Sequence, residues 1–385
     1  MKVLLTTPFF QFAGGSELET IHTANTFASF DIVNEVHVFI YAGYDIKFTR
    51  DIEINSKVKF FRRPKILDNK YLNKLNKEFK KFFNLDLLPF DVLYWKLIFF
   101  TKYDRVYIIT KTTLNYYLPV IRLYKNKKNI LVKYTTFFYD LMEERKREYL
   151  SNVRLNIVTS NKQRVFFSEN LNLINSDIQE VILFNEDYLL KKQRLIKDEK
   201  SFDFGILGRF SEEKQFEHAI NLIEDLKCEG HEATLIIRGG CDKDYYNYLV
   251  DLVINKGLGH LITLEFAEVS YDEVYDFFDC FNCFLITSKY EGGPNVGLEV
   301  MGYGLPILSY DVGAMRDRLV NFPEFIAENQ DDLKKKAISI LNYDEHEFIE
   351  ICAKVKNEYI NWYSNNLKFK FLNDFLITDN FVVKK

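Results

Sequence analysis

Glycine, proline and cysteine are all scarce: the 385 residues include 16 Gly, 7 Pro and 5 Cys. So little Gly and Pro excludes collagen-like and low-complexity chains. Five cysteines are sparse and odd in number, which excludes a disulfide framework and favours a reducing cytoplasm. The chain lacks any run of about 18 apolar residues, so we expect no membrane-spanning helix. The opening MKVLLTTPFFQ is too short for a secretory signal, has no small-residue cleavage site, and indicates a buried first strand.

Signals for metal and nucleic acid are missing as well. The six histidines show no metal-ligand spacing, and Cys280 and Cys283 have no second pair that would complete a zinc site. We therefore expect neither a metal nor an organic cofactor. The net charge of −4 divides into a basic front, with 28 Lys and Arg against 21 Asp and Glu in residues 1–190, and an acidic remainder. An acidic chain without a binding motif is not expected to bind nucleic acid.

Short apolar runs alternate with helical patterns along the chain, which predicts βαβ units and parallel sheets. The strand candidates of the first half are VLLTTPFF (3–10), VHVFIYA (36–42), VKFFR (58–62), RVYIIT (105–110), NILVKYTTF (129–137) and LNIVTS (155–160). A second series comprises FDFGILG (202–208), ATLIIRG (233–239), LITLEFA (261–267), CFLITS (283–288) and LPILSYD (305–311).

A charged stretch at 189–202 separates the two series and is the predicted linker. The length also fits two domains better than one core. We therefore predict an α/β fold with two Rossmann-like, doubly wound domains, residues 1–190 and residues 200–363, and a C-terminal helix at 364–385 that crosses back to the first domain. A ligand is expected in a cleft between the domains, at the carboxyl ends of the strands.

The strand CFLITS is followed by a glycine loop between two carboxylates. Glu291 comes soon after the strand, and a helix is predicted to start with Asn295 as its N-cap and to stop near Gly304. Exposed N–H groups and the helix dipole favour a phosphate, whereas the carboxylates suit sugar hydroxyls. A glycine-rich loop with two solvated glutamates is the structural alternative. The predicted ligand contacts here are Glu291, Gly292, Gly293, Pro294, Asn295, Val296 and Glu299.

The strand FDFGILG ends in Gly208, and Arg209 and Lys214 follow it. In a doubly wound sheet these cations lie on the same edge as the glycine loop. Two cations there would neutralise the charge that develops on a departing diphosphate. Surface ion pairs with Glu212 and Glu213 are the structural alternative.

Together these motifs resemble the retaining glycosyltransferases of family four (glycosyltransferase group 1), which have the GT-B fold. The likeness rests on G-R-x4-K (208–214) followed by E-G-x-P-N-V-x2-E (291–299), and it covers residues 200–320 most closely. Departures from the pattern are small: Ala314 replaces the second glycine of a Gly-Gly pair, and Asp317 stands where the family usually has Glu.

The resemblance implies a role for each motif residue. Arg209 and Lys214 are expected to hold the diphosphate of a nucleotide-sugar donor, with UDP as the expected nucleotide. Glu291 is expected to contact the donor sugar, and Glu299 the ribose hydroxyls. We take Glu291, Arg209 and Lys214 as the candidate catalytic residues, and expect the reaction to be independent of metal.

The first half carries fewer marks of this family. Gly14 and Gly15 resemble its N-terminal glycine loop, which faces the diphosphate, although an ordinary tight turn also explains them. Many relatives have a histidine near the reacting centre after the strand that corresponds to NILVKYTTF. This chain has the segment 135–138, Thr-Thr-Phe-Phe, instead.

We therefore expect a retaining enzyme that moves a sugar from a nucleoside-diphosphate sugar to a glycan or lipid-linked acceptor, in the assembly of cell-surface polysaccharide or glycoconjugate. Two alternatives stay open. The chain could be a catalytically silent GT-B subunit that binds glycan or a partner, or a GT-B epimerase or phosphorylase.

A basic segment at 56–82 contains ten Lys and Arg against two acidic residues. The stretch 70–83 at its end has Leu72, Leu75, Phe79 and Phe82 at helical spacing, with lysines between them. Such a helix suits anionic lipid head groups, although packing on its own domain is an equal alternative. We expect the protein in the cytoplasm, with a possible peripheral contact at the inner face of the membrane.

Overall fold

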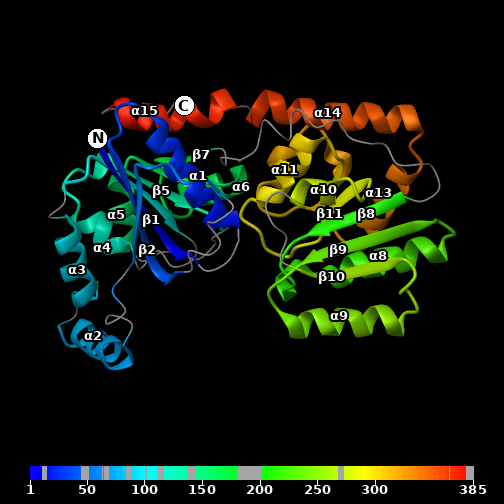
Figure 1. The fold of residues 1–385 in the computed structure, drawn as a ribbon, viewed down its shortest axis with the longest axis horizontal. Helices are drawn as coiled ribbons and strands as arrows, with labels where there is room; N and C mark the ends of the chain where they lie inside the picture. The colour runs from blue at the N-terminus through cyan, green and yellow to red at the C-terminus, as the bar shows by residue number, and fades with distance from the viewer. Residues whose placement is uncertain are drawn as a thin grey trace. The chain divides into compact units, whose positions relative to one another are not determined.

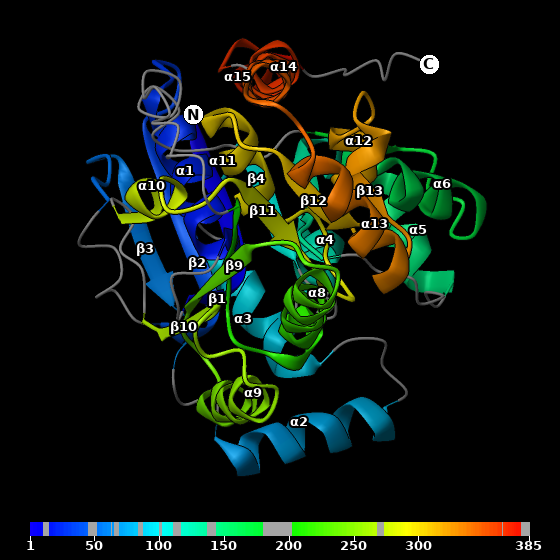
Figure 2. The ribbon, with the colours of Figure 1, turned by 90° about the vertical axis from the view of Figure 1, so that its right-hand side faces the viewer.

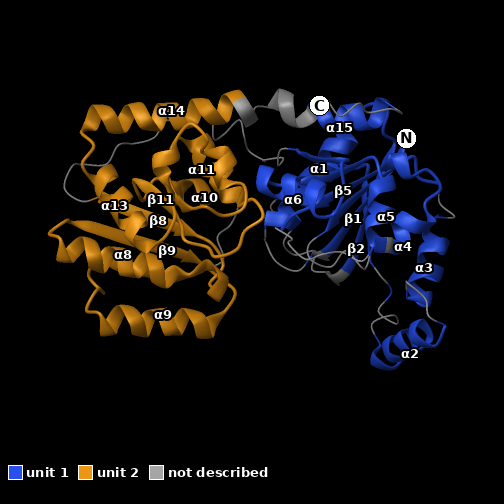
Figure 3. Cartoon of the chain, turned by 180° about the vertical axis from the view of Figure 1, so that it is seen from behind, with its two compact units in different colours: residues 1–182, 365–385 blue, residues 183–364 orange. Residues whose placement is uncertain are grey.

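The computed structural model describes residues 1–10, 15–44, 52–62, 64, 69–83, 88–99, 102–110, 117–136, 144–179, 202–267, 273–363 and 365–378. The chain divides into two compact units, shown in different colours in Figure 3. Unit 1 comprises residues 1–182 and 365–385, and unit 2 comprises residues 183–364. The linker predicted at 189–202 lies outside the described residues except for Phe202.

Unit 1 contains a parallel seven-stranded sheet in the order β3-β2-β1-β4-β5-β6-β7 (Figure 1). The direction of strand addition reverses between β1 and β4, as in a doubly wound fold. The strands are β1 (Lys2–Phe10), β2 (Glu35–Tyr44), β3 (Val58–Arg62), β4 (Arg105–Thr110), β5 (Ile130–Tyr134), β6 (Leu155–Val158) and β7 (Ser176–Ile178).

The sheet of unit 1 is buried on both faces because neighbouring residues of each strand enter different cores. In β1, Val3 and Leu5 join one hydrophobic cluster, whereas Leu4 joins another. This alternation follows from the period of two along a strand and explains why the strands read as continuous apolar runs. The helices that cover the two faces are α1 (Gly15–Ser29), α3 (Pro89–Phe99), α4 (Leu118–Leu123), α5 (Glu144–Asn152), α6 (Asn161–Glu169) and α15 (Asn365–Ile377).

The C-terminal helix α15 is bound to unit 1 by two buried arginines. The carbonyl of Phe375 accepts from Arg105 Nε at 2.7 Å and from Arg154 Nη1 at 3.0 Å. Both guanidinium groups also lie over the Phe375 ring, at 5.8 and 5.5 Å from its centroid. Cations at the carboxyl end of a helix complement its dipole, so this contact fixes α15 on the sheet.

Unit 2 contains a parallel six-stranded sheet in the order β10-β9-β8-β11-β12-β13. Helices α8 and α9 lie on one of its faces, and α10 and α11 on the other (Figure 1). The strands are β8 (Phe202–Leu207), β9 (Ala233–Gly239), β10 (Ile262–Phe266), β11 (Cys283–Ile286), β12 (Ile307–Tyr310) and β13 (Ile326–Ala327). The helices are α8 (Phe216–Cys228), α9 (Lys243–Asn255), α10 (Glu273–Phe278), α11 (Asn295–Tyr303), α12 (Met315–Arg318), α13 (Gln330–Leu341) and α14 (Glu345–Tyr363), with 3₁₀ turns η5 (Glu212–Lys214) and η6 (Pro323–Phe325).

The two Rossmann-like sheets confirm the predicted α/β class. Every predicted strand is present, with ends that differ by up to three residues. Two strands were missed: β7 and β13 are three and two residues long, too short to stand out as apolar runs. In the described part of the chain no helix is both long and apolar enough to span a bilayer.

Candidate active site

Three neighbouring strands of unit 2 bring the predicted residues to one edge of the sheet. Gly208 follows β8, Glu291 follows β11 and Gly313 follows β12, and these strands pair in parallel. The order of strands reverses between β8 and β11. In doubly wound sheets, ligands bind outside the carboxyl ends of the strands at such a switch point.

Lys214 and Glu291 form an ion pair at this edge. Their side chains are only 20% and 16% exposed, and the Ser288 hydroxyl donates to the same Glu291 oxygen at 3.0 Å. The backbone supports the pair, since the Thr287 hydroxyl donates to the Lys214 carbonyl at 2.8 Å. A partly buried lysine and carboxylate, 77 residues apart in the chain, are therefore held together by the fold.

Gln215, which has a left-handed backbone conformation, follows Lys214 and sets its position at the site. Lys214 ends the 3₁₀ turn η5, and Gln215 follows with φ of 48° before α8 begins. After Ser211 the chain thus forms the 3₁₀ turn η5, reverses at Gln215 and then enters α8. Because of this reversal, Lys214 belongs to η5 and does not follow the axis of α8.

Arg209 lies beside the pair but on the surface. Its guanidinium is 58% exposed and contacts Glu213 at 3.4 Å, which is the pairing considered as the structural alternative. Exposed ion pairs of this kind contribute about 0–1 kcal/mol. Arg209 is therefore able to exchange Glu213 for a more highly charged anion at little cost.

Close backbone contacts hold the neighbouring turns. A Cβ on Gly239 would come within 1.8 Å of the Gly208 carbonyl oxygen, so the end of β9 requires glycine there. Gly208 itself has only ordinary contacts around its missing Cβ, the nearest being 3.7 Å to Phe216. A Cβ on Gly208 would therefore meet only van der Waals contacts, so the turn after β8 does not require glycine for lack of space.

The loop from Glu291 to Pro294 packs against the turn after β12, which fixes its position. Gly313 has φ of +54°, and a Cβ there would lie 2.3 Å from the Gly292 carbonyl oxygen. The buried Arg318 donates from Nη1 to the Pro294 carbonyl at 2.6 Å. Arg318 was missed by the sequence reasoning because nothing in a surface-like run of charges marks it as buried.

Helix α11 begins where the loop ends, with one correction to the prediction. Pro294 is the N-cap, and Asn295 and Val296 are the first helical residues, so Asn295 is not the cap. Pro294 has the extended backbone conformation of an N-cap residue. Its side chain has no oxygen that could accept from the first N–H groups of the helix. No side chain caps this end. The C-terminal end is as predicted, with Gly304 at φ of 90°.

Glu299 lies one turn further along α11. It is half-buried, and desolvation raises the pKa of its carboxyl to about 7. The structure shows no hydrogen bond or ion pair to this carboxyl from the described residues. A carboxylate in such a place gains from hydroxyl groups that donate to it.

The predicted residues of unit 1 are only partly described. Gly14, Phe137 and Phe138 lie outside the described residues, and Gly15 is the first residue of α1. Thr135 follows β5, and its N–H donates to the Thr110 carbonyl at 3.0 Å. The buried hydroxyl of Thr136 has no hydrogen-bond partner among the residues that the structure describes.

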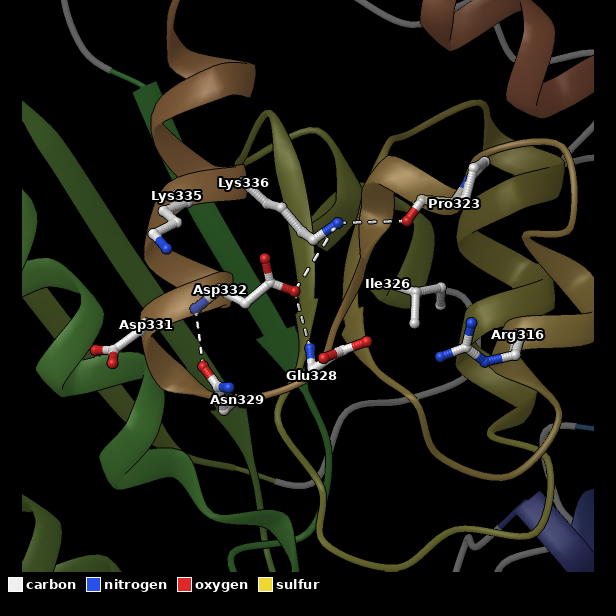
Figure 4. A pocket seen from close by; sticks show the side chains of 9 residues that line it. All are labelled: Arg316, Pro323, Ile326, Glu328, Asn329, Asp331, Asp332, Lys335 and Lys336. Atoms are coloured by element: carbon white, nitrogen blue, oxygen red, sulfur yellow. Dashed lines mark hydrogen bonds and ion pairs between the residues drawn. The ribbon is translucent and has the colours of Figure 1, made fainter.

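Unit 2 also has a hollow of about 550 Å³ (Figure 4). Its charges are of both signs: Lys336 contacts Asp332 at 3.9 Å, and Arg316 pairs at 2.8 Å with Asp311, which is not a lining residue. No predicted donor residue lines it. The lining residues are Arg316, Pro323, Ile326, Glu328, Asn329, Asp331, Asp332, Lys335 and Lys336.

Metal-ligating residues do not gather in the described ranges, where no group of three or more His, Cys, Asp and Glu is arranged around a common point. Cys283 is buried and Cys280 partly buried.

Known proteins share this architecture. Residues 188–357 match the model of a family described as glycosyl transferases group 1. No curated protein matches the sequence.

The solved structures that are similar to this chain include sucrose-phosphate synthase from Thermosynechococcus elongatus, with a TM-score of 0.75 at 14% identity over 98% of both chains. HepE from Anabaena, in complex with UDP and glucose, has a TM-score of 0.69 at 15% identity over 98% of this chain and 99% of its own. TarM from S. aureus, as a variant in complex with fondaparinux, α-GlcNAc-glycerol and UDP, has a TM-score of 0.70 at 12% identity over 97% and 99%. At such identities the likeness establishes the fold. The match assigns residues 188–357, within unit 2, to the glycosyl transferases group 1 family, and the two doubly wound sheets and the likeness to these structures give the chain the GT-B fold.

Proposed function

We propose that this protein is a retaining glycosyltransferase that moves a sugar from a nucleoside-diphosphate sugar to a glycan or lipid-linked acceptor. The observation that carries the proposal is the Lys214–Glu291 ion pair at the switch-point edge of unit 2. It combines a cation for a diphosphate with a carboxylate for a sugar hydroxyl, within the residues that match the glycosyl transferases group 1 model.

The donor would contact groups from three turns of unit 2. Lys214 and Arg209 would bind the diphosphate, next to the N-terminal end of α11, whose dipole favours anions. Glu291 would accept from a hydroxyl of the donor sugar, and Glu299 from the ribose hydroxyls. UDP is the proposed nucleotide, supported by its presence in the similar HepE and TarM structures.

In the proposed reaction the bond between the anomeric carbon and the diphosphate oxygen breaks, and the acceptor oxygen bonds to the same face of that carbon. The acceptor proton moves to the departing phosphate oxygen, so no protein base takes part, and we propose that the reaction is independent of metal. Lys214 and Arg209 stabilise the charge that develops on the diphosphate, which is the largest kind of catalytic contribution available to such a site. When Lys214 turns to the diphosphate, Glu291 is released to the sugar, with Ser288 still donating to it.

The biological setting that we propose is assembly of cell-surface polysaccharide or glycoconjugate. The protein would act in the cytoplasm and touch the inner face of the membrane through residues 56–82. The excess of lysine and arginine in that segment supports the contact.

Transfer of labelled sugar, measured with and without acceptor, tests the proposal. Lys214→Ala and Glu291→Gln should each reduce transfer at least 100-fold, the range seen when one group that stabilises transition-state charge is removed. The matched controls are Lys256→Ala and Glu224→Gln, because these residues form another partly buried Lys–Glu pair of unit 2 away from the site. Retention is read from the anomeric configuration of the product.

Each outcome has a distinct meaning. Donor binding without transfer to any acceptor would favour a silent subunit, and donor conversion without acceptor would favour an epimerase. Full activity in both site variants would contradict the proposed chemistry.

A further inference from the structure

Helix α2 (Lys70–Phe82) leaves its apolar residues in solvent. Tyr71 is 85% exposed and Phe82 is 81% exposed, and Leu75 is also exposed. The only buried residue of α2 is polar, Asn76. A helix that packs on its own domain shows the reverse pattern, with apolar residues buried and polar residues outside.

The residues of α2 separate into two faces. At 100° per residue, Tyr71, Leu75 and Phe82 lie within one narrow arc, and the remaining apolar residues, Leu72 and Phe79, extend its edge. The lysines occupy the opposite side without any apolar residue among them. They are Lys70, Lys74, Lys77, Lys80 and Lys81, and Glu78 is the one acidic residue of the helix.

Among the described residues, helix α2 contacts unit 1 at the start of α3. The Asn76 side chain accepts from the Phe90 N–H at the start of α3 at 3.0 Å, and the Phe79 and Phe90 rings lie edge to face, 6.1 Å apart. Figures 1 and 2 both show α2 beyond α3, away from the sheet of its own unit. The fold therefore fixes the helix and leaves most of its apolar arc uncovered.

We propose that α2 lies flat in the surface of an anionic lipid bilayer, with Tyr71, Leu75 and Phe82 inserted among the acyl chains and its lysines at the head groups. This gives a defined face to the proposed membrane contact of residues 56–82. A strongly charged face opposite an aromatic and aliphatic face is the arrangement of helices that bind in the interface of a bilayer. Binding of α2 to the bilayer would also favour a lipid-linked acceptor, because such an acceptor lies in the same membrane.

Charge complementarity selects the bilayer over other occupants. A second copy of the chain would bring another helix with five lysines and one glutamate, and like charges would repel. Nucleic acid would use the lysines and leave the exposed apolar arc without a role. A bilayer with anionic head groups satisfies both faces at once.

Co-sedimentation with vesicles tests the inference. The protein should bind vesicles of equal parts phosphatidylcholine and phosphatidylglycerol, and not vesicles of phosphatidylcholine alone. The combined substitutions Tyr71→Ser, Leu75→Ser and Phe82→Ser should weaken binding at least tenfold. The matched control is Ile32→Ser, Val165→Ser and Ile174→Ser, which removes three other exposed apolar side chains of unit 1.

The lysine face is tested separately. Lys74→Gln, Lys77→Gln and Lys81→Gln should weaken binding at least tenfold, and high salt should do the same in the unchanged protein. Lys102→Gln, Lys125→Gln and Lys128→Gln remove the same charge from other exposed positions of unit 1 and should leave binding unchanged.

Three results would overturn the inference: equal binding to both kinds of vesicle, no loss in either set of α2 variants, or a change from dimer to monomer in the Tyr71–Leu75–Phe82 variant with vesicle binding intact. Donor binding is followed in the same samples. Its absence would contradict the proposed enzymatic function without touching the vesicle result.

Discussion

Gly313→Ala should displace the loop from Glu291 to Pro294 and reduce sugar transfer, because it adds a methyl group against this loop. Gly313 has φ of +54°, and the new Cβ would lie 2.3 Å from the Gly292 carbonyl oxygen and 3.0 Å from that of Glu291. Both atoms belong to the loop that carries the proposed sugar-binding carboxylate. Because real Cβ atoms do not approach other atoms within 3.0 Å, the loop must move.

The size of the effect can be worked out against a matched glycine. Gly257 has a similar φ of +64°, with nothing within 4 Å of the position of a Cβ. Alanine at either position costs about 1–2 kcal/mol for the left-handed backbone, which lowers Tm by about 2–8 °C in a unit of this size. Only at Gly313 is there an added displacement, of about 1 Å, which can reduce catalysis by about 100-fold.

The assay is kcat/KM for sugar transfer, with thermal unfolding of the same samples. We expect Gly313→Ala to lose about 100-fold in kcat/KM and Gly257→Ala to match the unchanged protein, although both melt earlier. Equal activity of the two variants, whether both keep it or both lose it, would contradict the proposed displacement of the loop by the Gly313 Cβ.

Three further predictions concern charged side chains. Burial raises the carboxyl pKa of Glu299 to about 7. Because the ionised carboxylate accepts from the donor hydroxyls, the affinity of the protein for the donor should fall about tenfold for each pH unit below 7. In the Glu299→Gln variant, the donor affinity measured by titration should not depend on pH in this range. The same raised pKa means that this group stabilises the fold most below its unfolded value of 4.5 and loses that contribution as pH rises to about 7, a loss that Glu299→Gln should remove from pH-dependent unfolding curves. Arg154→Ala should cost about 1–3 kcal/mol of unfolding free energy in unit 1, since it takes a donor from the Phe375 carbonyl. Arg164→Ala, at a 48% exposed side chain, is its control; equal losses in urea unfolding would contradict the role given to the arginine contact.

Sequence periodicity predicted the sheets because most strands are buried on both faces. In β4 all six residues are buried, so the apolar run coincides with the strand. The same logic failed at β13, which has two residues. Its place at the edge of the sheet depends on pairing with β12, as Ser309 pairs with Ile326, and no local pattern contains that information.

The candidate site was predictable where motif and strand end coincide. Lys214 and Glu291 are 77 residues apart, and their meeting follows from the neighbouring positions of β8 and β11. Their direct ion pair could not be read from the sequence, which suggested Glu212 and Glu213 as partners instead. The role of Arg318 could not be predicted either, because its burial depends on the packing of α12 against the loop from Glu291 to Pro294.

The proposed donor site depends on binding of the nucleotide-sugar diphosphate by Lys214, which calorimetry measures. Titration calorimetry should show the unchanged protein and Lys256→Ala binding a UDP-sugar alike, and Lys214→Ala binding about 10- to 100-fold more weakly, the loss expected for a hydrogen bond to a charged group. Equal affinity of Lys214→Ala and Lys256→Ala for the donor would contradict the assignment of the site.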